Sequence, residues 1–401
     1  MSLSSKIQND FQNIINLFNL SLNKITISTT KILIFIGIIV FFCVIIQLQY
    51  DNAVLSQYIG KKEEETQIEK FTNKQQDIKP VNISITYAIP NDSKNVFAND
   101  KEKSSSHNYL QLMNELNIMA RSLTNETLYD FYQNCFQDIT PLEQKYTTKS
   151  VQVLLNNLNS QNKTSYVTYL KHWIEKSKLA KSISALEGNM PHTHDNYIIF
   201  PSEWYRNPNE STLIHELTHI HQRFKTNEFD ILYESFGFEY YNKGVHTIKG
   251  LEQAVDMSRH NPDGYDLNWI WMPRKYYKLS DNRSYFFITA KYPSIENPSL
   301  TNVEYVAYPL ERDNQGVYYK LTSEQPIPIS KLDIFQKHFG ITNNHYHPNE
   351  IAAQYAEYYL EDSLANKNDI EKTKRKSSGY SSYLLWMNKH LGYPDIFDRK
   401  R

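Results

Sequence analysis

The chain is poor in cysteine and glycine, and it has almost no net charge. Cys43 and Cys135 are the two cysteines in 401 residues. Because Cys43 lies in an apolar run, the rest of the chain has one cysteine and cannot form an internal disulfide. Eleven glycines, against an average of about 7% of residues, exclude collagen-like and glycine-rich linker proteins. With 43 Lys and Arg against 44 Asp and Glu, the chain as a whole has no electrostatic reason to bind nucleic acid.

One long apolar run lies near the amino end. Residues 32–46 contain no polar or charged residue, and the run extends to Leu48 with only Gln47 interrupting it. This length is at the short end of what a membrane-spanning helix needs. A core helix would have a polar face, and a cleaved signal peptide would have a shorter apolar part followed by a small-residue cleavage site. The sequence has neither feature and therefore predicts an uncleaved transmembrane anchor at 31–50.

The segments beside this run are amphipathic or polar. Within 1–30, apolar residues recur at helical spacing, which suits a helix in the membrane interface or against a protein partner. Residues 51–106 are polar, with strand-like alternation only at 81–89, and are typical of a stalk or linker. Lysines before the anchor favour an inside amino end, with the rest of the chain on the lumenal or extracellular side. The shortage of cysteine favours the opposite side.

Residues 107–401 have the patterns of a folded domain. Helical spacing of apolar residues dominates from about 108 to 185. Strand-like runs follow at 197–200, 284–292, 302–309 and 316–321. Helical runs return at 330–338, 348–364 and 381–390. This mixture predicts an α+β fold.

One short motif carries most of the chemical information. The chain contains His215-Glu216-Leu217-Thr218-His219, which is the His-Glu-x-x-His pattern. On a helix, residues four apart share one face, so both imidazoles can reach one Zn²⁺ ion at about 2 Å. Glu216 then lies beside the metal, where it can accept a proton from a metal-bound water. The motif therefore predicts a zinc-dependent hydrolytic site.

The residues around the motif are those that such a helix requires. Asn209 or Ser211 can cap its start. The helix face away from the histidines is apolar, with Leu213, Leu217 and Ile220. The run at 197–200, just upstream, predicts a short strand. The alternative is a helix whose two histidines are ordinary surface or core residues.

From about 190 to 364 the chain resembles the His-Glu-x-x-His zinc metallopeptidases, the zincins. The metzincin branch has Gly and His three and six residues after the second histidine. This chain has Gln222 and Lys225 there, so that branch is rejected. In the gluzincin branch a Glu from a later helix is the third ligand. The resemblance implies a zincin-like catalytic domain, in which an active-site helix lies beside a small sheet and an edge strand, here 197–200, holds the substrate.

The best match to the third ligand is Glu350, in the run His347-Pro348-Asn349-Glu350-Ile351-Ala352-Ala353-Gln354. Pro348 suits the first position of a helix, which puts Glu350 in the first turn, and the small Ala353 allows a close approach to the motif helix. An insertion at about 245–340 then separates His219 from Glu350. Glu234 and Glu239, in a predicted helix at 229–241, are rival ligands. The alternative for Glu350 is that it is not a metal ligand but an acid stabilised by a helix amino terminus.

Further residues are candidates for supporting roles. Gluzincins often have a carboxylate four residues after the third ligand, where this chain has Gln354, whose amide oxygen can accept a ligand imidazole N–H. The candidate oxyanion donors are His192, His194, His345, Tyr346 and His347. For each histidine the alternative is a capping or solvent-facing role. The run at 260–264 is a turn signal, and the aromatic run at 269–273 is either a cleft wall or sheet core.

Together these patterns predict a single-pass, membrane-anchored zinc peptidase with an anchor, a stalk and a catalytic domain at 107–401. Zn²⁺ is the expected cofactor, a peptide or protein is the substrate, and Glu216 is the general base. The membrane is contacted through 32–48, and no nucleic-acid partner is expected. Two alternatives stay open. One is a non-enzymatic membrane or virion protein with a structural or relic zinc site, and the other is a zinc hydrolase that cuts a non-peptide bond.

Overall fold

The computed structural model describes residues 80–97, 109–264, 267–273, 285–321, 324–340, 346–365 and 377–392. They belong to a compact unit that begins at Lys79. The amphipathic segment at 1–30 and the predicted anchor at 31–50 lie outside the described residues. Among the residues described, no helix is long and apolar enough to cross a membrane.

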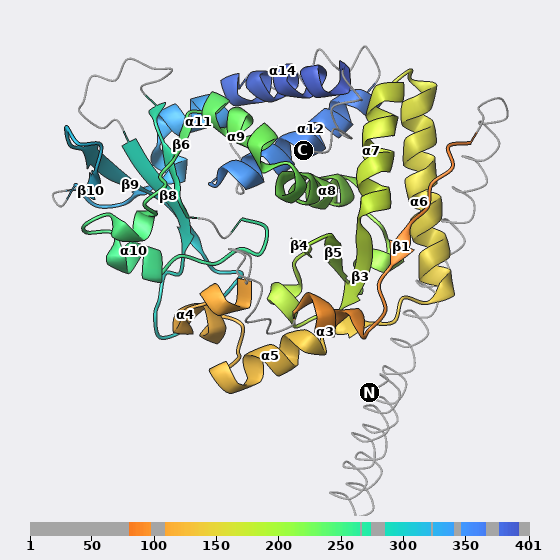
Figure 1. Cartoon of the computed structure of the whole chain (residues 1–401), viewed down its shortest axis with the longest axis horizontal. Helices are drawn as coiled ribbons and strands as arrows, with labels where there is room; N and C mark the ends of the chain where they lie inside the picture. The colour runs from red at the N-terminus through yellow and green to blue at the C-terminus, as the bar shows by residue number, and fades with distance from the viewer. Residues whose placement is uncertain are drawn as a thin grey trace, which may run out of the picture. The chain divides into compact units, whose positions relative to one another are not determined.

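The described residues form an α+β fold, which confirms the predicted class (Figure 1). The α-helices are α3 (Asp92–Val96), α4 (Glu115–Met119), α5 (Asn125–Gln133), α6 (Pro141–Ser160), α7 (Thr164–Lys176), α8 (Glu210–Phe224), α9 (Thr226–Ser235), α10 (Glu252–Asp256), α11 (Asp333–Phe339), α12 (Pro348–Leu364) and α14 (Ser378–Gly392). Short 3₁₀ helices are η1 (Tyr109–Leu112), η2 (Leu186–Asn189), η3 (Trp204–Arg206), η4 (Val245–Thr247) and η6 (Ile329–Lys331). The strands are β1 (Thr86–Tyr87), β2 (Phe136–Gln137), β3 (Lys178–Ser182), β4 (His192–His194), β5 (Tyr197–Pro201), β6 (Phe238–Tyr240), β7 (Trp269–Trp271), β8 (Tyr285–Lys291), β9 (Glu304–Arg312), β10 (Tyr318–Lys320) and β11 (Ile327–Pro328).

The first sheet has the order β1-β3-β5-β4, with β2 paired to β3. The strands β1, β3 and β5 run parallel, whereas β4 pairs antiparallel with β5. Along β5, Ile198 and Phe200 face the main core while Tyr197 and Ile199 face a second apolar cluster, as the two-residue period of a strand requires. Both faces of β5 are therefore buried, which explains its unbroken apolar sequence.

The second sheet is antiparallel throughout, with the order β10-β9-β8-β7-β6 and β11 paired to β9. It lies within the long sequence gap between His219 and Glu350. Trp269 and Trp271 of β7 are buried in the main core, and Ile270 faces a separate cluster on the other side. The aromatic run is thus sheet core and not a cleft wall.

The helices α8 and α12 pack against each other in the main core, and α8 also contacts β4 and β5. The Asn209 side chain caps α8 by accepting a hydrogen bond from Thr212 N at 2.9 Å. The apolar stripe predicted for this helix is buried, with Leu213, Leu217 and Ile220 at most 2% exposed. The helix α12 has the predicted bounds, and fully buried Ala352 and Ala353 give it a small surface for close packing.

Two segments differ from the sequence-based predictions. Residues 80–97, expected in the polar stalk, join the folded unit, because β1 pairs with β3 and the helix α3 packs on α5. The expected helix at 229–241 is wrong in its second half. The helix α9 ends at Ser235, and Gly237 turns the chain with a φ of 88° into β6. That left-handed backbone conformation is easily reached only by glycine.

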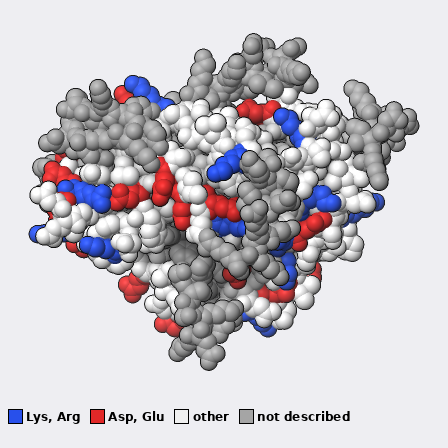
Figure 2. All heavy atoms as spheres, turned by 45° about the horizontal axis from the view of Figure 1, so that its top comes forward, with Lys and Arg blue, Asp and Glu red and all other residues white. Residues whose placement is uncertain are grey.

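Basic and acidic side chains of the described residues are interspersed on the face shown in Figure 2. Among the described residues, ion pairs form within elements and across them, such as Lys171 with Glu175 and Lys291 with Glu304. This arrangement matches the near-zero net charge of the chain.

Candidate metal centre and pocket

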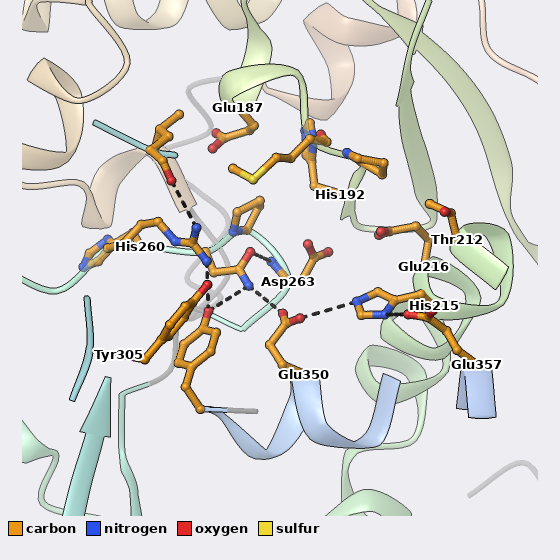
Figure 3. A pocket seen from close by; sticks show the side chains of 17 residues that line it. Glu187, His192, Thr212, His215, Glu216, His260, Asp263, Tyr305, Glu350 and Glu357 are labelled. Atoms are coloured by element: carbon orange, nitrogen blue, oxygen red, sulfur yellow. Dashed lines mark hydrogen bonds and ion pairs between the residues drawn. The ribbon is translucent and has the colours of Figure 1, made fainter. Parts of the chain in front are cut away.

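The motif helix places two imidazoles beside a carboxylate from α12. His215 and His219 lie on one face of α8, with ring centroids 4.9 Å apart. Glu350 is in the first turn of α12; its Oε2 is 3.4 Å from His215 Nε2 and its Oε1 is 3.7 Å from His219 Nε2. One ligand atom from each of these buried residues lies within 4.8 Å of the others. The cluster is therefore compatible with a metal site, and Figure 3 shows Glu350 and His215 directed toward each other.

Each imidazole is held by a hydrogen bond on the side away from the cluster. His215 Nδ1 bonds Glu357 Oε1 at 2.7 Å, and His219 Nδ1 bonds Gln222 Oε1 at 2.8 Å. Gln222 is itself fixed, because its Nε2 donates to the carbonyl of Asn349 at 2.9 Å. Since these side-chain oxygens accept, the Nδ1 atoms donate, so that in the neutral form of each ring the Nε2 lone pair faces the cluster. Such outer contacts orient metal-ligating histidines and raise their basicity.

The charges and unpaired atoms of the cluster also suit a cation. Burial alone would raise the pKa of Glu350, but His219, His215 and Arg259 lower it to about 2. Burial opposes protonation of His215, but its hydrogen bonds to Glu350 and Glu357 raise its pKa well above the ordinary value. Burial lowers the pKa of His219, and its Nε2 has no hydrogen-bond partner. Two ring nitrogens and one carboxylate, with a buried lone pair left over, fit a divalent metal ion.

Glu216 faces the same pocket without belonging to this cluster. It is 3% exposed, and its Oε2 is buried without a hydrogen-bond partner. Burial, with Asp263 and Glu350 nearby, raises its pKa well above the ordinary value. A buried carboxyl group with a raised pKa and an unpaired oxygen is suited to proton transfer.

A second set of ligand atoms overlaps with the first. Glu216, His219 and Asp263 also have atoms within 4.8 Å of one another. However, Asp263 Oδ1 already accepts hydrogen bonds from Thr193 N at 2.7 Å and from Thr193 Oγ1 at 2.5 Å. The cluster that contains both imidazoles with fixed Nδ1 atoms is therefore the better fit to a metal ion.

The loop at 259–264 lines one side of the pocket. Asn261 Nδ2 donates to Glu350 Oε1 at 2.6 Å and to the Tyr346 hydroxyl at 3.1 Å. Arg223 Nη2 donates to the carbonyls of Pro262 at 2.9 Å and Thr193 at 3.0 Å. The loop is thus tied both to the third candidate ligand and to the first sheet.

The strand at the edge of the first sheet is β4, so the predicted edge strand at 197–200 is wrong. That run forms β5, which lies between β3 and β4. The three-residue β4 is too short for its sequence to show a strand period. At its centre, the N–H of Thr193 is bonded to Asp263 and its carbonyl to Arg223. The middle of this edge is therefore already hydrogen-bonded within the protein.

The structure brings only some of the predicted supporting residues to the pocket. His192 lines it, with Nδ1 3.0 Å from the Met190 carbonyl and a buried Nε2 without a hydrogen-bond partner. His194 instead packs against the rings of Phe97 and Tyr109. His347 caps α12, where its Nδ1 accepts from Asn349 N at 3.3 Å.

The remaining candidates lie elsewhere. Glu357, and not Gln354, holds the His215 ring, and it lies two helical turns beyond Glu350 on the same face. Glu234 is exposed at the end of α9, and Glu239 on β6 bonds Arg312 and Tyr318, so the structure places neither rival in the cluster. His345 lies outside the described residues.

Sequence reasoning missed several groups that line the pocket. The pocket has a volume of about 320 Å³, which is within the range of small-molecule sites. Among its lining residues are Glu187, Arg259, Asn261 and Asp263, which the sequence did not single out as functional. Of these, Asn261 and Asp263 lie in the turn predicted at 260–264, but the turn signal gave no information about which site the turn would reach.

Comparisons with known proteins do not assign the chain to a family. No protein-family model, no curated protein and no solved structure matches the chain. The assignment therefore depends on the residues and their geometry.

Replacing Glu357 with alanine should weaken metal binding by about 10- to 100-fold, because His215 loses the carboxylate that orients it and raises its basicity. Competition with a chelator, with Zn²⁺ as the probe ion, measures the change. Glu361→Ala, an exposed position one turn further along α12, is the matched control and should leave the affinity unchanged. Equal effects of the two substitutions would contradict the role given to Glu357.

Proposed function

We propose that this chain is a membrane-anchored, zinc-dependent peptidase of gluzincin-like type, with His215, His219 and Glu350 as ligands. The observation that carries the proposal is the pairing of two features in one pocket. A buried imidazole–imidazole–carboxylate cluster lies beside a separate carboxyl group, Glu216, which has a buried unpaired oxygen. A relic or purely structural metal site has no need of that second group.

The donor set favours zinc over the harder cations. Two imidazole nitrogens and one carboxylate oxygen, with room for a fourth ligand, are typical of catalytic zinc, whereas Mg²⁺ and Ca²⁺ prefer all-oxygen sites. When bound, Zn²⁺ supplies a Lewis acid for a carbonyl oxygen and lowers the pKa of water. Glu357 and Gln222 already direct the Nε2 atoms of both histidines into the cluster, where the neutral rings would bind the ion.

Glu216 would act as the proton carrier. As a carboxylate it accepts a proton from the attacking water, and as a carboxylic acid it donates that proton to the leaving nitrogen. Burial raises its pKa, which makes its carboxylate form a stronger base than that of an exposed glutamate. Transfer is aided because burial keeps competing water away from its Oε2.

Tyr346 is the best-placed neutral donor for a developing oxyanion. Its hydroxyl accepts from Asn261 at 3.1 Å and from Arg259 at 3.4 Å, which leaves its own proton free for another acceptor. His192 is less suited while neutral, because its Nδ1 proton is used on the Met190 carbonyl. It would need a second proton to donate from Nε2.

The membrane part of the proposal depends on the sequence alone. The apolar run at 32–48 has the length and composition of a single span, and it precedes the folded unit that begins at Lys79. The lysine distribution favours a catalytic unit on the lumenal or extracellular side. A peptide or protein is the proposed substrate.

The proposal is tested by metal content and peptide turnover of the full-length chain in detergent. We expect about one zinc per chain, and His215→Ala should reduce the zinc content at least tenfold. His246→Ala, an exposed histidine on η4, is the matched control and should keep the zinc. Absence of zinc would refute the proposal. Zinc without hydrolysis of any peptide in a diverse mixture would favour a non-enzymatic membrane or virion protein.

A further inference from the structure

Three arginines lie at or behind the pocket wall, and two of them face a carboxylate. Arg121 is bonded to Glu187 at 2.7 Å, and Arg223 lies 3.7 Å from Asp263. Arg259 lines the pocket, yet no carboxylate oxygen of the described residues lies within 4.0 Å of its guanidinium nitrogens. Among the described residues it therefore has no direct ion pair, although Glu350 lies near enough for Arg259 to lower the pKa of that carboxyl group.

The partners of Arg259 are neutral, and one of its nitrogens has none. Its Nη1 donates to the Leu300 carbonyl at 3.2 Å and its Nη2 to the Tyr346 hydroxyl at 3.4 Å. Its Nε is buried and makes no hydrogen bond. An unpaired buried donor on a guanidinium is costly, and a carboxylate is the group whose geometry best satisfies a guanidinium.

The position of Arg259 is fixed on both sides. Its backbone N–H donates to the carbonyl of Ala290 on β8 at 2.7 Å, which anchors the start of the loop to the second sheet. Its guanidinium carbon lies 6.0 Å from the centre of the Tyr346 ring, and that ring packs on Tyr305 at 5.2 Å. Such packing holds the guanidinium in place before a substrate arrives.

Arg259 lies close to the candidate metal centre. Hydrogen bonds of 2.6, 3.1 and 3.4 Å connect Glu350 through Asn261 and Tyr346 to its Nη2. The guanidinium is thus less than about 10 Å from the third candidate ligand, which is the span of roughly three extended residues. A carboxylate bound there would belong to a residue roughly one or two positions from the bond that is cut.

The sheet edge argues against recognition of a long extended chain. A peptide adding to β4 needs free backbone groups along that edge, but those of Thr193 are bonded to Asp263 and Arg223. Recognition therefore has to come from groups inside the pocket, and Arg259 is the cation available there.

We propose that Arg259 binds a carboxylate of the substrate and so restricts the enzyme to peptides with a free carboxyl terminus or an acidic side chain next to the cut bond. This inference depends on the proposed peptidase function. It deepens that function by naming the substrate class. The role of Arg259 is to determine specificity, and Glu216 keeps the proton-transfer step.

The test measures binding separately from turnover. Full-length Glu216→Gln protein, loaded with zinc, is dialysed against three pools of N-acetylated tetrapeptides, and retained peptide is measured by mass spectrometry. The peptides of the first pool end in a free carboxylate, and those of the second pool end in a carboxamide. Those of the third pool also end in a carboxamide, but their last residue is Asp or Glu. We expect at least tenfold stronger retention of a carboxylate pool than of the plain amide pool. The double variant with Arg259→Gln should lose this preference.

The controls separate the outcomes. Arg259→Lys keeps the charge and should restore part of the preference, and Arg312→Gln, a surface arginine paired with Glu239, should leave it unchanged. Preference for the first pool identifies the chain terminus as the carboxylate, and preference for the third identifies a side chain. Equal retention of all pools, or a preference that persists in Arg259→Gln, overturns the inference. If wild-type protein hydrolyses nothing while the carboxylate preference holds, only the peptidase proposal fails.

Discussion

Glu216→Gln should lower kcat/KM for peptide hydrolysis by about 10²- to 10⁴-fold or more while leaving the zinc content unchanged. Glutamine has nearly the same shape as glutamate, so the packing of α8 is kept, but its amide cannot accept the proton of the attacking water. The metal is expected to stay because the assigned ligands are His215, His219 and Glu350. Turnover of a peptide mixture and elemental analysis of the same sample measure both quantities.

One control variant and two contradicting outcomes test the role of Glu216. Glu210→Gln lies in the first turn of the same helix, bonded to Ser150, and should change turnover by less than about twofold. Retained hydrolysis in Glu216→Gln would refute its role as the base. Loss of zinc would instead favour the overlapping set of Glu216, His219 and Asp263 as the metal site.

The parts of the site that could be predicted are those that depend on short spacings along the sequence. His215, Glu216 and His219 follow from a four-residue helical repeat, and Glu350 follows Pro348 at a helix start, so local geometry determines their placement. The apolar period of α8 and the bounds of α12 were predictable for the same reason.

The parts that could not be predicted depend on tertiary packing. The sequence predicted Gln354 as the acceptor for a ligand imidazole, whereas Glu357 bonds His215 in the structure. The packing of α12 on α8 sets the rotation of α12 about its axis and so decides which turn faces the ring. Asn261 and Asp263 lie in a recognisable turn, but contacts with β8, α12 and β4 bring that turn to the pocket. The strand β1 has two residues, and its pairing with β3 is what draws 80–97 into the folded unit.

Arg121→Met should destabilise the folded unit by about 3–5 kcal/mol, because it leaves the Glu187 carboxylate buried without its cation. Arg121 and Glu187 side chains are 1% and 2% exposed, and the pair also bonds the hydroxyls of Tyr109 and Tyr132. Arg121 further donates to the His260 carbonyl at 3.0 Å, so the pocket loop should loosen as well. Urea unfolding followed by tryptophan fluorescence measures the change, since all five tryptophans lie in the described unit.

The pH dependence of this loss gives a second check. Burial alone would raise the pKa of Glu187, but Arg121 and the surrounding hydrogen bonds hold it below the ordinary value. The stabilisation from the pair is therefore present above the unfolded carboxyl pKa of about 4.3 and is lost as the pH falls through the lower folded value. The difference between wild type and Arg121→Met should shrink in acid.

Two further variants distinguish charge burial from lost packing. Adding Glu187→Gln to Arg121→Met should restore more than half of the lost stability, because no uncompensated charge remains. Lys171→Met breaks a partly exposed pair with Glu175 on α7 and should change the free energy of unfolding by no more than about 0.5 kcal/mol. If the double variant is as unstable as Arg121→Met, the loss comes from packing and from the His260 contact, and the buried charge is not its cause.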